Sequence, residues 1–287
     1  MKKISQKDRK YVISSIVPPI VVFAVITLVP TIMLIILTLT NLSLTTAGKQ
    51  DFIGLGNYIR LFKDTRFLIS LEVTLKFVIG AVFLELLIGT GLALFLQKCV
   101  RFIRTIILLP SMLAPVVIGL LWKIVLNFEG PLNSIINILH IPKIAWLTNP
   151  NFIFFVVMFV DIWQWSPFMM LIIFAGLQRV DKNIVEAAQV DGASRLQTFG
   201  YITLPSIESI LLVAIAIRLI DAIKTFDTIF VLTGGGPGHS TELLSIYAFK
   251  TGISGGNIAY ASAIAIFILL IAFTASRFLL ARRVLGK

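Results

Sequence analysis

The sequence predicts an all-α, polytopic membrane protein with about six transmembrane helices. Of its 287 residues, 57% are hydrophobic and only 14% are charged, and the mean hydropathy is +0.97, a composition far from that of a soluble domain. Apolar runs of about 20 residues, each long enough to cross a hydrocarbon core of ~30 Å, account for most of the chain. We therefore expect residues 1–287 to form a single transmembrane domain.

Six apolar runs are expected to form the spans. The first follows a basic N-terminus, as in a signal peptide, but it is too long for an h-region and lacks a small-residue cleavage site, so we expect it to be retained. Three prolines within it remove backbone donors and are expected to bend it. Residues 51–64, which follow, form either a short amphipathic helix at the outer interface or a packed loop. The runs lie near residues 11–40, 71–97, 105–127, 152–177, 206–231 and 260–281.

The net charge of +11 is distributed over alternate loops rather than on one face, which argues against a nucleic-acid partner. Under the positive-inside rule these loops share the cytoplasmic side, so we expect both termini and the loop 178–205 to be cytoplasmic. The basic residues are Lys2, Lys3, Lys7, Arg9 and Lys10, then Lys98, Arg101 and Arg104, then Arg179, Lys182 and Arg195, and finally Arg277, Arg282, Arg283 and Lys287.

Metal and disulfide chemistry are not expected. Cys99 is the only cysteine, so the chain can form neither an intrachain disulfide nor a thiolate cluster. His140 and His239 are isolated in predicted outer loops, whereas a stable metal site needs three or four converging ligands. No G-x-x-x-x-G-K-[ST] sequence occurs, and Thr233–Gly238 lacks that spacing, so P-loop hydrolysis of ATP is excluded for this chain.

The loop 178–205 is a polar island between the fourth and fifth runs. Glu186, Ala187 and Ala188 are followed after three residues by Gly192, and after nine more by an I-x-L-P sequence that begins at residue 202. Asp181 is expected to cap a helix that Gly192 interrupts. Small side chains allow close approach to a partner, and charged ones offer oriented contacts. Taken singly, each residue has a structural interpretation as a cap, a turn or a helix start.

This pattern resembles the EAA loop of ABC-importer permeases, the cytoplasmic element through which a separate ATPase drives the membrane subunit. The resemblance implies a coupling role for Glu186, Ala187, Ala188, Asp191, Gly192, Ala193, Arg195, Leu204 and Pro205. It extends over most of the chain and is closest to sugar-type permeases, such as those for maltose or glycerol phosphate. The motifs that carry this likeness are Asn127 to Pro131, Trp146-Leu147-Thr148, Phe226-Asp227, Thr233 to Pro237, and Thr241.

The resemblance implies a type I ABC importer permease fold in a prokaryotic plasma membrane. Its partners would be a second homologous permease, expected to be a different chain, two copies of a nucleotide-binding ATPase and an extracytoplasmic solute-binding protein. ATP and Mg²⁺ would be bound by the ATPase, so this chain is expected to be neither an enzyme nor a cofactor-binding subunit.

Two of the predicted spans carry polar and aromatic faces that are candidates for a solute pathway. Charged residues inside a span cost several kcal/mol unless they meet partners or water. Aromatic rings stack on sugar rings, while carboxylates, amides and hydroxyls bond to sugar hydroxyls. The residues recur at steps of three or four: Asp161, Gln164, Trp165 and Phe168, then Arg218, Asp221, Ala222 and Thr225. By resemblance these positions align with the sugar site of maltose-type permeases, although Asp161, Trp165, Arg218 and Asp221 are bulkier or more charged than that pattern.

Several alternatives stay open at this point. Arg218 and Asp221, three residues apart, could form a structural salt bridge, and the tryptophans could serve packing. The acidic face would also suit a peptide, amino acid or polyamine. A secondary transporter with Asp161 or Asp221 as proton carrier would work without ATP, and a purely structural subunit is a third possibility. Lys76, Glu85 and Lys123 also lie in or near spans and are left unassigned.

Overall fold

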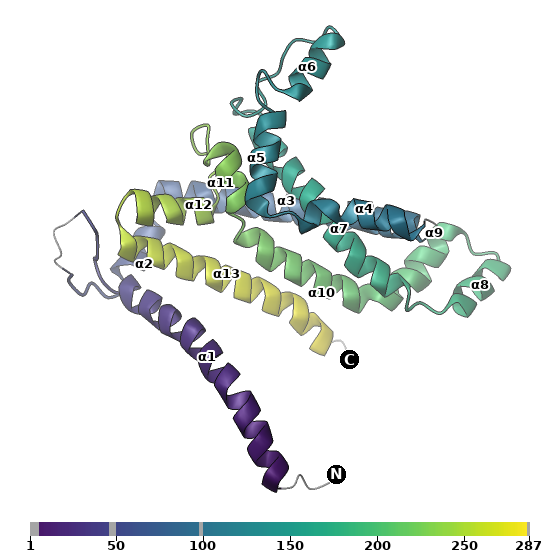
Figure 1. The fold of residues 1–287 in the computed structure, drawn as a ribbon, viewed down its shortest axis with the longest axis horizontal. Coiled ribbons are helices and arrows are strands. Elements are labelled where there is room, and N and C mark those ends of the chain that lie inside the picture. Colours follow the sequence, from purple (N-terminus) through teal and green to yellow (C-terminus); the bar gives the residue numbers. More distant parts are fainter. Residues whose placement is uncertain (1–5, 46–49, 98–99, 286–287) are drawn as a thin grey trace. The chain divides into compact units, whose positions relative to one another are not determined.

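The computed structural model describes residues 6–45, 50–97 and 100–285, which Figure 1 colours along the chain. Several residues noted in the sequence lie outside this part: Lys2, Lys3, Lys98, Cys99 and Lys287. The α-helices are α1 (Gln6–Thr38), α2 (Gly56–Leu61), α3 (Thr65–Leu96), α4 (Arg101–Met112), α5 (Pro115–Val125), α6 (Pro131–Ile138), α7 (Ile153–Leu177), α8 (Lys182–Val190), α9 (Arg195–Thr198), α10 (Leu204–Ile223), α11 (Asp227–Thr233), α12 (Leu244–Phe249) and α13 (Ile258–Leu285). Two π-helices, η1 (Phe199–Thr203) and η2 (Lys250–Ser254), complete the set.

The predicted all-α fold is confirmed: within the described ranges, β structure is confined to one isolated bridge between Thr40 and Phe52. Four helices, α1, α3, α7 and α13, are long and apolar enough to cross a membrane. Helices α4 and α5 together could form a fifth span. Helix α10 has 20 residues but carries Glu208, Arg218 and Asp221, so length and composition alone do not identify it as a span.

The third predicted run is not one helix. Helices α4 and α5 meet at a break where their axes bend by 93°, and the two residues between them are extended, with ψ of 145° at Leu113 and 137° at Ala114. The cause is Pro115, the first residue of α5, because a proline ring disfavours the helical conformation in the residue before it. The fifth run, expected to reach residue 231, likewise divides into α10 and α11.

The chain forms two compact units, and the smaller one comprises residues up to 64 together with 248–267. Asn57 anchors α2 in this unit by donating from its amide to the carbonyl oxygens of Thr38 and Thr40, both at 2.8 Å. Only the six residues of α2 are helical in the region 51–64. The amphipathic helix is therefore shorter than the stretch of sequence that predicted it. Helix α1 continues through Pro18, Pro19 and Pro30.

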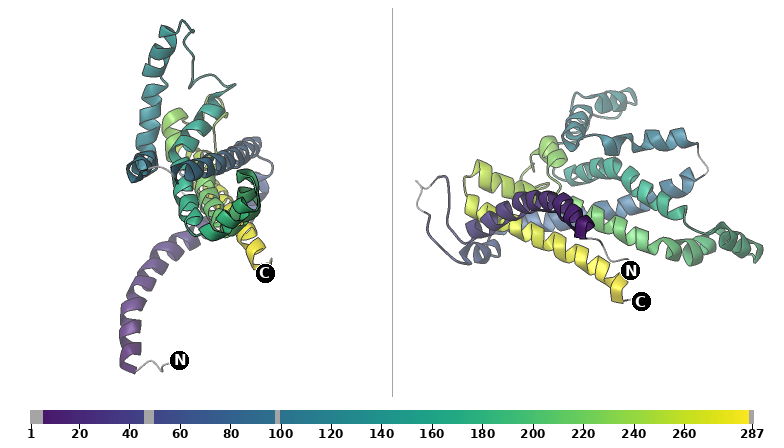
Figure 2. Two further views of the ribbon diagram at one scale, coloured as in Figure 1. Left: turned by 90° about the vertical axis from the view of Figure 1, so that its right-hand side faces the viewer. Right: turned by 60° about the horizontal axis from the view of Figure 1, so that its bottom comes forward.

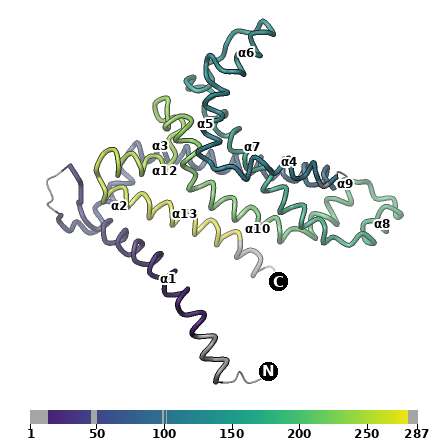
Figure 3. The backbone as a smooth tube through the Cα atoms, viewed as in Figure 1, coloured from purple at the N-terminus to yellow at the C-terminus, as the bar shows by residue number. Residues whose placement is uncertain are grey.

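The larger unit comprises residues 65–247 and the chain from residue 268 onward. Within it, α3, α7 and α10 pack against one another, as Figures 2 and 3 also show. Small residues permit this approach: a Cβ placed on Gly89 of α3 would lie 2.7 Å from Cβ of Met169 in α7. Close backbone contact through glycine is a common way for membrane helices to associate. One of the buried apolar clusters that these three helices share comprises Ala93, Leu96, Met170, Ile173, Leu177 and Ile207.

Candidate functional site

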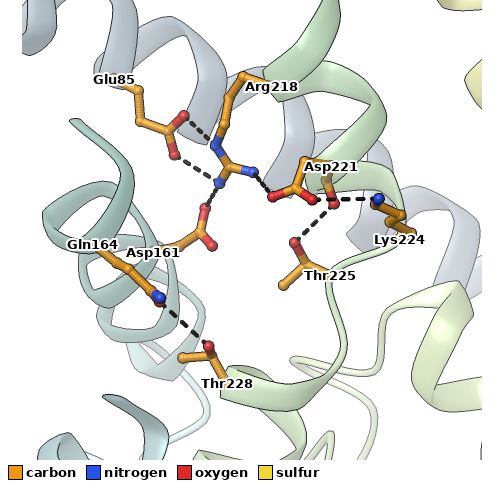
Figure 4. A network of polar contacts seen from close by, with 8 residues as sticks. All are labelled: Glu85, Asp161, Gln164, Arg218, Asp221, Lys224, Thr225 and Thr228. Carbon is orange, nitrogen blue, oxygen red and sulfur yellow. Dashed lines mark hydrogen bonds and ion pairs between the residues drawn. The ribbon is translucent and has the colours of Figure 1, made fainter. Parts of the chain in front are cut away.

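A buried ion-pair network joins α3, α7 and α10 in the larger unit (Figure 4). Its centre is Arg218, whose side chain is fully buried. The guanidinium donates from Nε and Nη2 to the two oxygens of Glu85, at 2.6 and 2.9 Å, in a bidentate pair. Nη2 also donates to Asp161, and Nη1 donates to Asp221 at 3.3 Å. Three carboxylates from three helices therefore share one cation.

The energetics of such a network follow from its burial. Removing an ion from water costs several kcal/mol, and only well-placed opposite charges and hydrogen bonds offset that cost. Glu85 and Asp161 are 0% and 1% exposed at their side chains, whereas Asp221 is 36% exposed. The two buried carboxylates thus depend on Arg218. Asp221 lies at the edge of the network, where Lys224 contacts its other oxygen at 3.5 Å.

The structure brings most of the predicted pathway residues together around Arg218. The ring centroid of Trp165 is 5.2 Å from the guanidinium carbon, and Phe168 meets Trp165 edge-on at 6.0 Å between centroids. Thr225 donates to the backbone carbonyl of Asp221 at 3.2 Å. Both predicted faces, one on α7 and one at the end of α10, therefore border the same cluster.

Two predicted pathway residues lie inside the protein. Gln164 is fully buried; it accepts a hydrogen bond from Thr228 at 3.5 Å and donates to the carbonyl of Leu113 at 3.4 Å. It thereby ties α7 to the break before α5 and to α11. Ala222 is also fully buried and belongs to the apolar core. Their contacts in this structure are internal.

Sequence reasoning left Glu85 unassigned, although it forms the bidentate pair with Arg218. The available signal was a carboxylate within an apolar run, since such a group requires a partner. The other unassigned residues also have partners: Lys76 pairs with Glu72 at 2.6 Å, and Lys123 donates to the carbonyl of Val231 at 3.0 Å. His239, predicted to be isolated, contacts Glu242 at 2.7 Å.

The polar island between α7 and α10 folds as its sequence indicated. The carboxylate of Asp181 accepts from the backbone N–H of Asn183 at 2.9 Å and caps α8. Gly192 then adopts φ of +86°, a left-handed conformation that residues with a Cβ rarely adopt. Ser194 and Gln197 form a reciprocal capping box that starts α9. A capped helix, a glycine turn and a second capped helix therefore follow in order.

The predicted coupling residues lie together on this segment, residues 182–205, and most are exposed. Glu186, Asp191 and Arg195 are exposed, and a Cβ on Gly192 would meet no atom within 4 Å. Larger apolar side chains are exposed as well: Val190 at 87%, Leu196 at 84% and Tyr201 at 82%. These three were absent from the sequence prediction, because no motif distinguishes an exposed apolar residue from a buried one.

The long apolar helices and the buried intramembrane charges define a polytopic membrane protein. Residues 85–286 match the family described as binding-protein-dependent transport system inner membrane component. The chain belongs to this family, and both the coupling segment and the ion-pair network lie within the matched residues.

Curated relatives extend the match. The chain is 38% identical over 232 residues to a trehalose/maltose transport system permease protein of Thermococcus litoralis, covering 79% of this chain and 78% of the relative. It is 34% identical over 267 residues to a sulfoquinovosyl glycerol transport system permease protein of Agrobacterium fabrum, covering 90% of this chain and 85% of the relative.

Solved structures show the same fold. A chain of a bacterial alginate ABC transporter, solved in complex with an alginate pentasaccharide-bound periplasmic protein, superposes with a TM-score of 0.82 over 96% of each chain at 23% identity. The predicted type I importer permease fold is therefore confirmed.

Proposed function

We propose that this chain is one membrane-spanning permease subunit of an ATP-driven, binding-protein-dependent sugar importer. The sugar class is supported by the names of the trehalose/maltose and sulfoquinovosyl glycerol permeases, and dependence on a binding protein is supported by the family description. The solute pathway is formed with a second homologous permease, a different chain, and borders the middle of α7 and the end of α10.

The rest of the assembly follows from the same proposal. Two copies of a nucleotide-binding ATPase bind ATP and Mg²⁺ and hydrolyse the ATP, whereas this chain has no enzymatic activity and no cofactor of its own. An extracytoplasmic binding protein delivers the sugar. The subunit lies in a prokaryotic plasma membrane with both termini and residues 178–205 in the cytoplasm, as the distribution of basic residues predicts.

One observation carries the coupling mechanism: the coupling segment continues as an unbroken helical run into the ion-pair network. Residues 195–223 are helical throughout, as α9, η1 and α10 in succession. Arg218 and Asp221 lie in the last turns of this run. A packed helix moves as a rigid element, so displacement of the coupling segment by the ATPase would be transmitted to Arg218 and Asp221. Transport would then follow ATP-driven rearrangement of the pathway.

Coupling can be tested with two variants in the coupling segment. Gly192→Trp places bulk at an exposed position with positive φ, and Glu186→Lys reverses an exposed charge on α8; both should abolish ATP-driven uptake while leaving membrane abundance near wild type. Glu129→Lys makes the same charge reversal in the loop before α6 and should preserve uptake. Uptake and complex assembly are measured together in membrane vesicles. Wild-type uptake by both coupling variants would refute the assigned role.

The solute pathway can be tested at Trp165. Trp165→Ala removes an aromatic surface that can stack on a sugar ring, so the apparent affinity for uptake should weaken by about 1 kcal/mol, or roughly fivefold. Trp163→Ala is the matched control, because Trp163 lies on the same helix and packs edge-on against Trp122 at 5.4 Å. It should change abundance rather than affinity. Equal apparent affinities in Trp165→Ala and wild type would exclude stacking on this residue.

A further inference from the structure

The cations beside the proposed solute pathway are already neutralised by carboxylates of this chain. We propose that the transported sugar carries no acidic group, and that Asp221 disfavours acidic sugars; this inference rests on the sugar-importer function proposed above. It concerns the charge of the solute, which membership of the family leaves open.

Arg218 is the cation that an acidic sugar would need, and it is not accessible. Its side chain has no exposed surface. Four hydrogen bonds, two to Glu85 and one each to Asp161 and Asp221, engage its N–H groups, and Trp165 covers one side of the guanidinium. A guanidinium has five N–H donors, so these carboxylates occupy most of its capacity. An anionic solute would have to displace a bonded carboxylate, which would then be left buried and unpaired.

The remaining charges around the network are unfavourable to anions. The cluster contains three carboxyl groups, on Glu85, Asp161 and Asp221, and two cations, on Arg218 and Lys224, so each cation already has a carboxyl partner within this chain. Asp161 Oδ1 is buried and has no hydrogen-bond partner in the described part of the chain.

The groups that the edge of the network presents suit a solute with neutral hydroxyls. Asp221 is 36% exposed at its side chain, and a carboxylate accepts hydrogen bonds from sugar hydroxyls. Trp165 and Phe168 are half-buried and offer aromatic surface. A sugar carboxylate, phosphate or sulfonate beside Asp221 would instead meet a like charge, which is strongly unfavourable where water is scarce.

The test uses the complete importer, with both permeases, the ATPase and the binding protein, in proteoliposomes that contain ATP. Uptake of labelled maltose and trehalose is compared with uptake of the same sugars oxidised to uronic acids at C6. We expect the uptake rate of each transported neutral sugar to exceed that of its uronate by about tenfold or more. Uptake of a uronate as fast as its neutral counterpart would overturn the inference. Uptake of an amino acid, peptide or polyamine with no saccharide uptake would instead overturn the proposed function.

Variants separate the permease's selectivity from that of the binding protein, which stays unchanged. Asp221→Asn should reduce the neutral-to-acidic uptake ratio at least about threefold, because it removes the exposed negative charge. Glu208→Gln removes a carboxylate from the opposite end of α10, at an exposed position, and should leave the ratio unchanged. An Asp221→Asn ratio equal to that of the wild type would overturn the role of Asp221.

The internal role of Arg218 has its own test. The triple variant Arg218→Met, Glu85→Gln and Asp161→Asn removes the buried charges together and leaves Asp221 paired with Lys224. The neutral-to-acidic uptake ratio should stay within about threefold of wild type, whatever the overall rate, because none of the three removed groups binds the solute. A ratio that falls towards one in a triple variant that assembles normally would mean that Arg218 or one of its two buried partners contacts the solute. If the triple variant does not accumulate in the membrane, the neutral-to-acidic uptake ratio of Asp221→Asn decides whether the inference holds.

Discussion

The ion-pair network and the coupling segment both depend on charged residues, but their surroundings are opposite. In the network, Arg218, Glu85 and Asp161 are buried, and the guanidinium pairs with both carboxyl groups. In the coupling segment, Glu186, Asp191 and Arg195 are exposed, beside apolar side chains that nothing in the described chain covers. The first region is complete within the subunit. The second leaves charged and apolar side chains exposed, as the proposed docking of the ATPase requires, and helical residues 195–223 join the two.

The largest effect on stability is expected when the cation of the network is removed and its buried carboxyl groups remain. Arg218→Gln leaves Glu85 and Asp161 buried without their cation, and loss of one member of a buried ion pair typically costs about 3–5 kcal/mol. The subunit should therefore show a strongly reduced membrane abundance and a lowered melting temperature in detergent. Both are measured on the full-length chain. A variant as stable as wild type would show that the carboxylates find other partners or become neutral.

The next effect should appear in partner binding and not in folding. Leu196→Ser and Tyr201→Ala remove side chains that are 84% and 82% exposed, so the free subunit should keep its stability. If these residues anchor the ATPase, each truncation should weaken its binding by about 2 kcal/mol, or roughly 30-fold. Titration of the purified ATPase onto the permease pair measures this. Ile138→Ser, at another strongly exposed apolar residue on α6, is the matched control and should not alter ATPase affinity.

This contrast between the regions also explains how far the sequence could predict each one. The coupling segment is local: Asp181, Gly192 and the helix starts follow from neighbours within a few residues, and the structure shows them as expected. The network is not local. Asp161 and Arg218 could each be recognised as intramembrane charges, but the partner of Arg218 on α3 lies 133 residues away in sequence. No periodic pattern specifies a pairing over such a separation.

The fold shows the same limit. The composition was sufficient to predict an all-α membrane protein, because a bilayer forces each spanning backbone to satisfy its own hydrogen bonds. Hydropathy could not show that the run 105–127 breaks, since its residues are apolar on both sides of the break. Ala114 before Pro115 was the local signal for it. The 93° bend depends in addition on tertiary packing, such as the contact between α5 and α11 around Gly119.

A smaller effect is expected from the helix cap that shapes the coupling segment. Asp181→Ala removes the acceptor of the Asn183 N–H bond, and loss of an N-cap costs about 1 kcal/mol. Because α8 contributes no buried residue, this loss should loosen α8 locally and leave the melting temperature of the subunit almost unchanged. Hydrogen exchange over residues 182–190 should rise several-fold. Asp181→Asn, which can still cap, should restore protection; equal exchange in wild type and Asp181→Ala would show that tertiary contacts hold α8.

The smallest effect is expected for an ion pair of the same chemistry outside the buried network. Lys143 pairs with Glu129, whose side chain is 71% exposed, and its ammonium also lies 5.5 Å from the ring centroid of Phe128. Glu129→Gln removes the ion pair but keeps the contact with Phe128. Exposed pairs contribute about 0.2–1 kcal/mol, because water solvates the partner that remains. The melting temperature of Glu129→Gln should therefore differ little from wild type, and the difference should shrink further as salt is raised from low to physiological concentration. A loss comparable to that of Arg218→Gln would mean that this loop is buried in the assembly, and that solvent exposure does not separate the two kinds of charge site in this protein.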